Sequence, residues 1–199
     1  MIDNCCSILL SAHFSGIKIA NDVLDLELFY ANSSFMECIL SSLVPVINSK
    51  LYPATTGTSQ SVRFSSLRRT NRTTGDFSHP LIQKLETTLS SLYASLGYSN
   101  VQFYEAGVYK AGEYFSRHYD YLSDHPALRA RTILLYSGEN PIGGELVFPL
   151  VDVSILPLSG LIVSWSNISK SQELSLASLH ESKLLVSGTK MVLTFFASL

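Results

Sequence analysis

The chain has 199 residues, a formal net charge of −2 and a hydrophobic fraction of 46%. A chain of this length can bury the core of one domain, so we expect residues 1–199 to form a single domain. Only 15% of the residues are charged, which leaves no basic face for nucleic acid or for an anionic membrane. No segment approaches the roughly 20 consecutive apolar residues of a membrane helix, so we expect a soluble protein without nucleic-acid or membrane partners.

The cysteines and the first residues predict the compartment. The three cysteines, Cys5, Cys6 and Cys38, are too few and too unevenly placed for a disulfide framework. Asp3 precedes a short apolar run at the position where a secretory signal would carry positive charge. Reduced thiols in a cytoplasmic protein are therefore expected, with the endoplasmic reticulum as the alternative.

Two amphipathic helices are expected before residue 98. Apolar residues recur at helical spacing over residues 34–51, and Pro53 follows as a stop signal. A second apolar stripe runs over residues 79–96, with Pro80 in the first turn and Gly97 at the end. The polar stretch between them, residues 52–78, is predicted to be a long mobile loop that closes over a substrate. Both stripes should face a core: Phe35, Met36, Ile39, Leu40, Leu43, Val46 and Ile47 in the first, and Ile82, Leu85, Leu89, Leu92 and Leu96 in the second.

After Gly97 the sequence changes to short segments rich in β-branched and aromatic residues. Strands are expected over residues 101–109, 114–121, 129–137, 145–149, 161–165 and 189–197. Turn residues at 111–112, 123–124, 138–141, 159–160 and 187–188 separate them. The pattern predicts an α+β fold: a jelly roll, or double-stranded β-helix, at 98–199, braced by helical support from residues 1–97.

Three residues form a candidate metal site. His118 and Asp120 lie two residues apart, so on a strand both would point to one face of the sheet. His180, in a different element, can supply a third ligand. Two imidazoles and one carboxylate leave open positions on an octahedral iron(II) ion, as an oxygenase requires. The same three ligands could also hold zinc or another metal, because the order of affinities does not select iron.

Lys190 is a candidate anion-binding residue. It begins the apolar run that continues to Phe196, so its ammonium group would be carried into the core region. Burial of a cation is unfavourable unless an anion accompanies it. The distal carboxylate of 2-oxoglutarate would meet that need, with its keto-acid end at the metal. Arg129 and Arg131 are the reserve candidates for the same carboxylate.

The second half of the chain resembles the catalytic domain of prolyl 4-hydroxylases. The resemblance runs from about residue 101 to residue 196, and residues 61–65 and 71–74 resemble a substrate-side loop of that family more loosely. Order and spacing agree throughout the matching segments, which are residues 109–113, 118–120, 129–136, 143–149, 157–160 and 180–190.

The resemblance assigns roles residue by residue. His118, Asp120 and His180 correspond to the iron ligands, and Lys190 to the residue that pairs with the distal carboxylate of 2-oxoglutarate. Arg129 corresponds to an arginine at the pocket mouth and is the candidate for contacting substrate during catalysis. The remaining pocket residues implied are Tyr109, Tyr136 and Thr132. The two tyrosines could equally be core residues of the barrel.

Some positions depart from the family pattern. Many relatives have threonine after Gly-Gly-Glu and tryptophan after the lysine, where this chain has Leu146 and Met191. The cysteine that often follows the distal histidine is also absent, within Glu181 to Lys183. One hydrogen bond to the cosubstrate is therefore expected to be missing, while the metal ligands are intact.

The resemblance implies an iron(II)- and 2-oxoglutarate-dependent dioxygenase, similar to procollagen-proline 4-dioxygenase, with O2 as second cosubstrate and ascorbate as a candidate additional cofactor. A prolyl residue in a peptide or protein is the expected substrate. The alternatives are a free amino acid or other small molecule, and a non-catalytic jelly-roll binding protein. Asp120 disfavours a halogenase, in which chloride takes the carboxylate's place. Lysine rather than arginine after the distal histidine disfavours a nucleic-acid demethylase.

Overall fold

The computed structural model describes residues 24–31, 33–53, 55–56, 63–64, 68–69, 71–74 and 79–199. Its larger sheet has seven strands, all paired antiparallel, in the order β1-β12-β9-β14-β7-β6-β2. These strands are β1 (Leu26–Tyr30), β2 (Tyr52–Pro53), β6 (Asn71–Thr74), β7 (Asn100–Lys110), β9 (Arg131–Gly143), β12 (Leu161–Ser166) and β14 (Leu185–Ser198).

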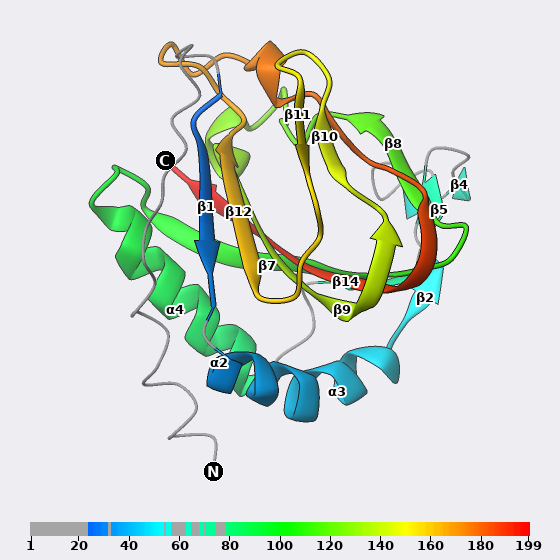
Figure 1. Ribbon diagram of the computed structural model, residues 1–199. Helices are drawn as coiled ribbons and strands as arrows, with labels where there is room; N and C mark the ends of the chain where they lie inside the picture. The colour runs from blue at the N-terminus through cyan, green and yellow to red at the C-terminus, as the bar shows by residue number, and fades with distance from the viewer. Residues whose placement is uncertain are drawn as a thin grey trace.

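A smaller sheet of five strands lies opposite, in the order β11-β10-β13-β8-β5 (Figure 1). Its strands are β5 (Arg68–Arg69), β8 (Tyr114–His118), β10 (Leu146–Phe148), β11 (Val153–Ile155) and β13 (His180–Ser182), and a separate ribbon pairs β3 (Thr55–Thr56) with β4 (Arg63–Phe64). The space between the two sheets is filled by a core that includes Tyr136, Leu146, Phe148 and Trp165. This arrangement confirms the expected α+β jelly roll.

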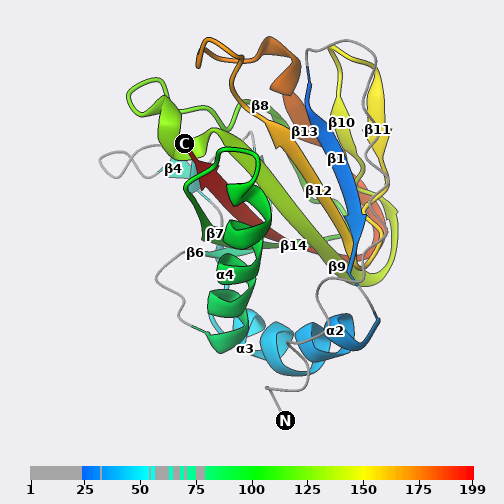
Figure 2. The same cartoon turned by 90° about the vertical axis from the view of Figure 1, so that its left-hand side faces the viewer.

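The helices cover the outer face of the larger sheet. Figure 2 shows α4 (Pro80–Ala94) against β7 and β14, with the segment from α2 (Ser33–Cys38) to α3 (Val44–Asn48) below it. The two predicted apolar stripes pack into one core with the outer side chains of this sheet. Leu40 and Leu96 differ from the expectation, because both are exposed. The helices therefore brace one face of the jelly roll, as predicted.

The first helical segment is interrupted by a π-helical turn, Ile39–Leu43, that the periodicity did not predict. Pro45 follows it in the first turn of α3. Proline has no N–H and its ring collides with the carbonyl group four residues earlier, so the helix widens by one residue before it. The N–H of Val44 accordingly donates to the carbonyl oxygen of Ile39.

Two of the expected turns are bends inside long strands. Residues 138–141 lie within β9 and residues 187–188 within β14, and the pairing of these strands shifts register there. Gly138 and Gly188 have positive φ values of 149° and 77°. A β-carbon at either position would overlap backbone oxygen atoms of the opposite strand. The glycines are turn signals in the sequence, but here they let two strands bend together while remaining paired.

Several strands come from the region expected to be helical support or loop. β1 pairs with β12 at the edge of the larger sheet, and β6 pairs with β7, so the sheet draws strands from both sides of residue 98. Within the expected loop, residues 52–53, 55–56, 63–64, 68–69 and 71–74 are short strands. The rest of that segment, on which the closing-loop prediction depends, lies outside the described residues.

The expectation of reduced thiols is wrong for Cys38, which is disulfide-bonded. Its partner lies outside the described residues. The spacing of cysteines along a sequence does not fix their distance in space, which explains the error. None of the helices in the described ranges is long and apolar enough to cross a membrane.

Candidate metal centre and cosubstrate pocket

The three predicted ligands meet at one end of the smaller sheet. β8 ends at His118 and β13 begins at His180, and these two histidines are direct partners in the antiparallel pair. Asp120 follows two residues after the end of β8, so the expectation that it lies on the strand is wrong. One potential ligand atom from each of the three residues lies within 4.8 Å of the others. The structure therefore brings together the three side chains that the sequence predicted as metal ligands.

Hydrogen bonds orient both imidazole rings. The Nδ1 atom of His118 lies 2.8 Å from the carbonyl oxygen of Ser116, and the Nδ1 atom of His180 lies 2.8 Å from that of Ser178. A carbonyl oxygen can only accept, so each Nδ1 carries the proton and donates it. Each Nε2 atom is then the nitrogen able to ligate a metal ion.

Asp120 completes the set as a carboxylate. Its oxygens lie 3.6 Å from the Nε2 atom of His118 and 3.7 Å from that of His180, both longer than a hydrogen bond. Burial acts to raise the pKa of Asp120. The imidazoles of His180 and His118, together with a hydrogen bond from Thr132, outweigh that effect and hold the pKa below its usual value. Two imidazoles and one ionised carboxylate around a shared point fit an iron(II) ion.

Thr132 and Asn167 hold the carboxylate in place. The hydroxyl of Thr132 on β9 donates to Asp120 Oδ2 at 2.8 Å. Asn167 is fully buried, and its side-chain NH2 donates to Thr132 Oγ1 at 2.7 Å and to the carbonyl oxygen of Arg129 at 3.1 Å. Because Thr132 accepts from Asn167, its own hydrogen is directed to Asp120. The resemblance placed Thr132 in the cosubstrate pocket, whereas the structure shows its hydroxyl bound to Asp120.

Aromatic rings enclose the two histidines. The ring of Phe115 stacks on His118 with centroids 3.7 Å apart. The rings of Trp165 and Phe148 lie 4.8 Å and 5.8 Å from His180. Apolar walls of this kind limit the access of water to a metal centre.

Lys190 is buried between the sheets with 1% of its surface exposed. Its Nζ atom donates to the carbonyl oxygen of Gly144 at 2.8 Å and to the hydroxyl of Ser182, and it lies 4.1 Å from the ring centroid of Tyr109. Burial lowers the pKa of Lys190 to about 7, against a smaller opposing effect of Glu145. Within the described part of the chain, no carboxylate forms an ion pair with this ammonium group. A buried cation held only by neutral groups fits the predicted role of anion binding.

The two predicted tyrosines line the same interior. Tyr109 on β7 and Tyr136 on β9 are both buried. Burial, with a smaller contribution from the neighbouring Tyr109, raises the pKa of Tyr136, so its phenol stays protonated and can donate a hydrogen bond. Both side chains pack in the inner core. They are therefore barrel core residues, and Tyr109 also stands beside Lys190, so the two readings of the sequence are compatible for Tyr109.

The two arginines have different surroundings. Arg129 lies at the end of the short helical turn Pro126–Arg129, with its guanidinium group 4.4 Å from the ring centroids of Tyr104 and Phe196. Its charge also contributes to lowering the pKa of Asp120. This partly exposed cation stands beside the metal site.

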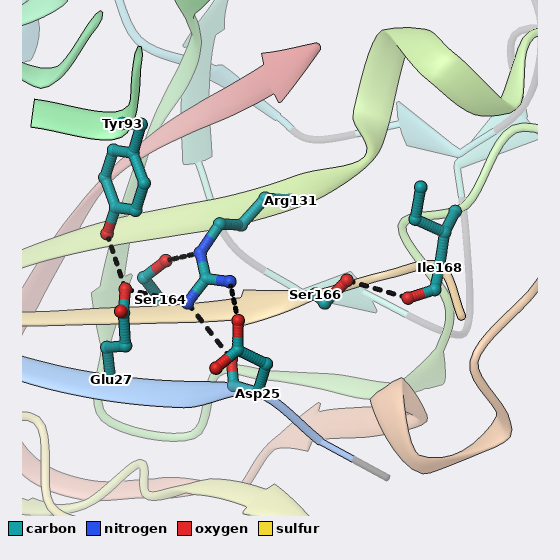
Figure 3. A network of polar contacts seen from close by, with 7 residues as sticks. All are labelled: Asp25, Glu27, Tyr93, Arg131, Ser164, Ser166 and Ile168. Carbon is teal, nitrogen blue, oxygen red and sulfur yellow. Dashed lines mark hydrogen bonds and ion pairs between the residues drawn. The ribbon is translucent and has the colours of Figure 1, made fainter. Parts of the chain in front are cut away.

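Arg131 is not available for the cosubstrate. Its guanidinium group binds Asp25 and Glu27 at 2.6 and 2.8 Å and Ser164 at 2.5 Å (Figure 3). All its polar nitrogens are engaged in a network on the side of the sheet that faces α4. The reserve role considered for Arg131 is therefore wrong, because its charge is already neutralised.

Three contributors to the site were missed in the sequence: Asn167, Ser182 and the carbonyl group of Gly144. Asn167 follows an apolar strand in the run Trp165-Ser166-Asn167, and a buried polar residue after such a run is the signal that could have identified it. Ser182, two residues after His180 on a strand, shares its face, which could have marked it as well.

The sequence matches no protein-family model. It is 26% identical over 125 residues to prolyl 4-hydroxylase subunit alpha-1 of Gallus gallus, which covers 58% of this chain and 24% of that protein. The chain thus spans about a quarter of the length of this curated relative.

Solved structures of prolyl hydroxylases superpose on the chain. A Pseudomonas putida prolyl-4-hydroxylase matches with a TM-score of 0.65 and 14% identity over 98% of each chain. A Trichoplax adhaerens prolyl hydroxylase, in complex with a hypoxia inducible factor peptide, has a TM-score of 0.66 and 16% identity over 98% of this chain and 90% of its own. The collagen prolyl hydroxylase of Paramecium Bursaria Chlorella virus-1, in its 2-oxoglutarate complex, has a TM-score of 0.54 and 23% identity over 65% and 80%. Together with the arrangement of the two sheets, these matches establish that the chain has the fold of the prolyl 4-hydroxylases.

Proposed function

We propose that this protein is an iron(II)- and 2-oxoglutarate-dependent dioxygenase that hydroxylates an unactivated C–H bond. One observation carries the proposal: a His-Asp-His ligand set and a buried lysine without a carboxylate partner among the described residues lie between the same two sheets. Bound iron with 2-oxoglutarate and O2 would supply the oxidation of the C–H bond. A zinc ion in the same three ligands would not require an anion-binding lysine beside it. The buried Lys190 therefore favours iron(II) with 2-oxoglutarate over zinc.

The chain's own residues would bind the metal ion and 2-oxoglutarate, orient them, and keep water out of the site. His118, Asp120 and His180 would hold the metal on one side and leave its other side open for cosubstrates. Lys190 would hold the distal carboxylate, and Tyr109 and Tyr136 would line the space around it. Thr132 would fix the rotamer of Asp120 through the hydrogen bond described above. The aromatic rings around the histidines would keep bulk water from the reacting centre.

The substrate class proposed is a prolyl residue in a peptide or protein. The peptide complex of the Trichoplax adhaerens enzyme supports it by analogy of fold. Arg129 is the residue of this chain proposed to contact substrate, because it is partly exposed and lies beside Asp120. A free amino acid remains the second candidate, since loops rather than the sheet decide substrate choice.

We also propose that the described segments form one catalytic domain and that the protein resides in an oxidising compartment. The disulfide at Cys38 favours the endoplasmic reticulum over the cytoplasm, because cytoplasmic thiols are kept reduced.

His118→Ala and Asp120→Ala test the metal assignment. Each should abolish succinate release from 2-oxoglutarate and the weak visible absorption of an anaerobic iron(II)–2-oxoglutarate complex, while leaving the protein folded. His125→Ala, at an exposed histidine in the following loop, is the matched control and should behave as wild type. Assays with proline-containing peptides and with free amino acids, each with and without ascorbate, identify the substrate class. Comparable decarboxylation by Asp120→Ala under metal-controlled conditions would refute the assignment.

A further inference from the structure

We propose that Ser182 binds the distal carboxylate of 2-oxoglutarate together with Lys190. The inference rests on the proposed function and adds a binding residue to it. The Nζ atom of Lys190 donates to the hydroxyl oxygen of Ser182, so the two side chains already lie in contact.

Lys190 and Ser182 each keep one hydrogen-bond donor, and the two donors lie side by side. The ammonium group of Lys190 has three N–H bonds, and its contacts to Gly144 and Ser182 use two of them. Ser182 accepts from the ammonium, so its own O–H points elsewhere and remains a donor. One N–H and one O–H next to each other match the two oxygens of a carboxylate. Hydrogen bonds between a cation and a carboxylate are also stronger than those between neutral groups.

The strand pairing places the Ser182 hydroxyl on the face of the smaller sheet that points into the core. Ser182 on β13 is the direct partner of Leu146 on β10. Directly opposed residues of an antiparallel pair present their side chains on the same face, and Leu146 is buried in the core between the sheets. Leu146 carries no hydroxyl, so within this directly opposed pair the hydroxyl is that of Ser182.

The distance from His180 to Ser182 along β13 also fits the length of 2-oxoglutarate, a five-carbon diacid. His180 and Ser182 are two residues apart on β13, which corresponds to about 6.6 Å of strand. That distance is comparable with the length of extended 2-oxoglutarate. The pairing of β13 with β8 shifts register between them, but both side chains reach the interior, where His180 is buried and Ser182 contacts the buried Lys190. One strand can therefore present a metal ligand at one end of the cosubstrate and a carboxylate contact at the other.

Ser182→Ala tests the proposal through binding rather than turnover. The dissociation constants of 2-oxoglutarate and of 2-oxopentanoate, which lacks the distal carboxylate, are measured by anaerobic titration of the iron(II)-loaded protein. We expect Ser182→Ala to weaken 2-oxoglutarate about tenfold and to leave 2-oxopentanoate unchanged. Ser154→Ala, at an exposed serine on β11 of the same sheet, is the matched control and should alter neither constant.

A rescue variant separates binding from structural effects. Leu146→Thr in the Ser182→Ala background should recover part of the lost affinity, because it restores a hydroxyl on the facing residue. Equal affinities for 2-oxoglutarate in wild type and Ser182→Ala would overturn the inference, as would equal weakening of both keto acids. If the iron-loaded wild type binds neither keto acid, the proposed function itself fails, and the Ser182 inference with it.

Discussion

At the scale of single residues, Lys190 separates cosubstrate binding from metal binding. Its ammonium group contacts Gly144 and Ser182 and no metal ligand. Lys190→Ala should therefore raise the KM for 2-oxoglutarate about tenfold to 150-fold, for a loss of roughly 1.5–3 kcal/mol. Iron(II) affinity should stay close to that of the wild type. Steady-state kinetics and a separate metal titration measure the two effects.

Lys190→Arg should lie between wild type and Lys190→Ala. It keeps the charge, but its planar guanidinium group must fit a space that holds a compact ammonium. An unchanged KM in Lys190→Ala, accompanied by weaker iron binding, would contradict this assignment. Arg129 would then be the next candidate, because Arg131 is held by Asp25 and Glu27.

The buried position of Lys190 also predicts a pH dependence of 2-oxoglutarate binding. Burial lowers the pKa of Lys190 to about 7 without the cosubstrate, so the amine is largely neutral above that pH. A bound carboxylate favours the charged form and raises this pKa, which means that binding takes up a proton above about pH 7. The dissociation constant should rise with pH above about 7, by up to tenfold per unit, and be nearly flat below it.

Titration calorimetry in two buffers of different ionisation enthalpy measures the proton uptake directly. Lys190→Arg should abolish it, because arginine stays protonated throughout this range. Binding that is independent of pH in the wild type, without proton exchange, would show that Lys190 is already charged before the cosubstrate binds.

At the scale of elements, the bends of β9 and β14 depend on glycine for space as well as for conformation. A β-carbon on Gly188 would overlap the carbonyl oxygens of Asn140 and Glu139. Gly112 has a similar φ, +84° against +77°, but no atom lies within 4 Å of where its β-carbon would be. Gly188→Ala should cost about 2–5 kcal/mol of unfolding free energy, and Gly112→Ala about 1–2 kcal/mol from backbone strain alone. Urea denaturation compares the two, and equal losses would refute the steric argument.

At the scale of the whole molecule, the network around Arg131 joins four elements that are distant in sequence. Arg131 lies on β9, Ser164 on β12 and Glu27 on β1, and Tyr93 of α4 donates to Glu27 at 3.3 Å (Figure 3). The edge strand β1 is thereby tied to the centre of the larger sheet and to the helix outside it. Burial acts to lower the pKa of Arg131, but Glu27, Tyr93 and Tyr98 together outweigh that effect and hold the pKa above its usual value.

Arg131→Ala should destabilise the fold by about 3–5 kcal/mol, because it leaves Glu27 partly buried without its cation. Asp25→Asn is the matched comparison, since the side chain of Asp25 is 61% exposed and its ion pair should contribute less than about 1 kcal/mol. Chemical denaturation measures both, and the 2-oxoglutarate affinity of the folded variants should match that of the wild type. A selective loss of that affinity in Arg131→Ala would place the residue in the cosubstrate pocket after all.

The sequence by itself determined the elements and residue types whose pattern is local. The apolar stripes of α4 and of the first helical segment, six of the strands, the spacing of His118 and Asp120, and the lysine at the start of an apolar run follow from spacing and composition. Local periodicity is sufficient for these, because burial of one face fixes both the element and its orientation.

Only the tertiary structure decided the contacts between distant segments. These contacts join residues whose separation in sequence carries no information about their distance in space. They are the pairing of β1 with β12, the ion pair of Arg131 with Glu27, the support of Asp120 by Thr132 and Asn167, and the contact of Ser182 with Lys190. Glycines 138 and 188 show the same limit, because a residue that permits a sharp turn also permits a bend in a paired strand. Which of the two forms depends on the neighbouring strand, and that is fixed only when the whole sheet assembles.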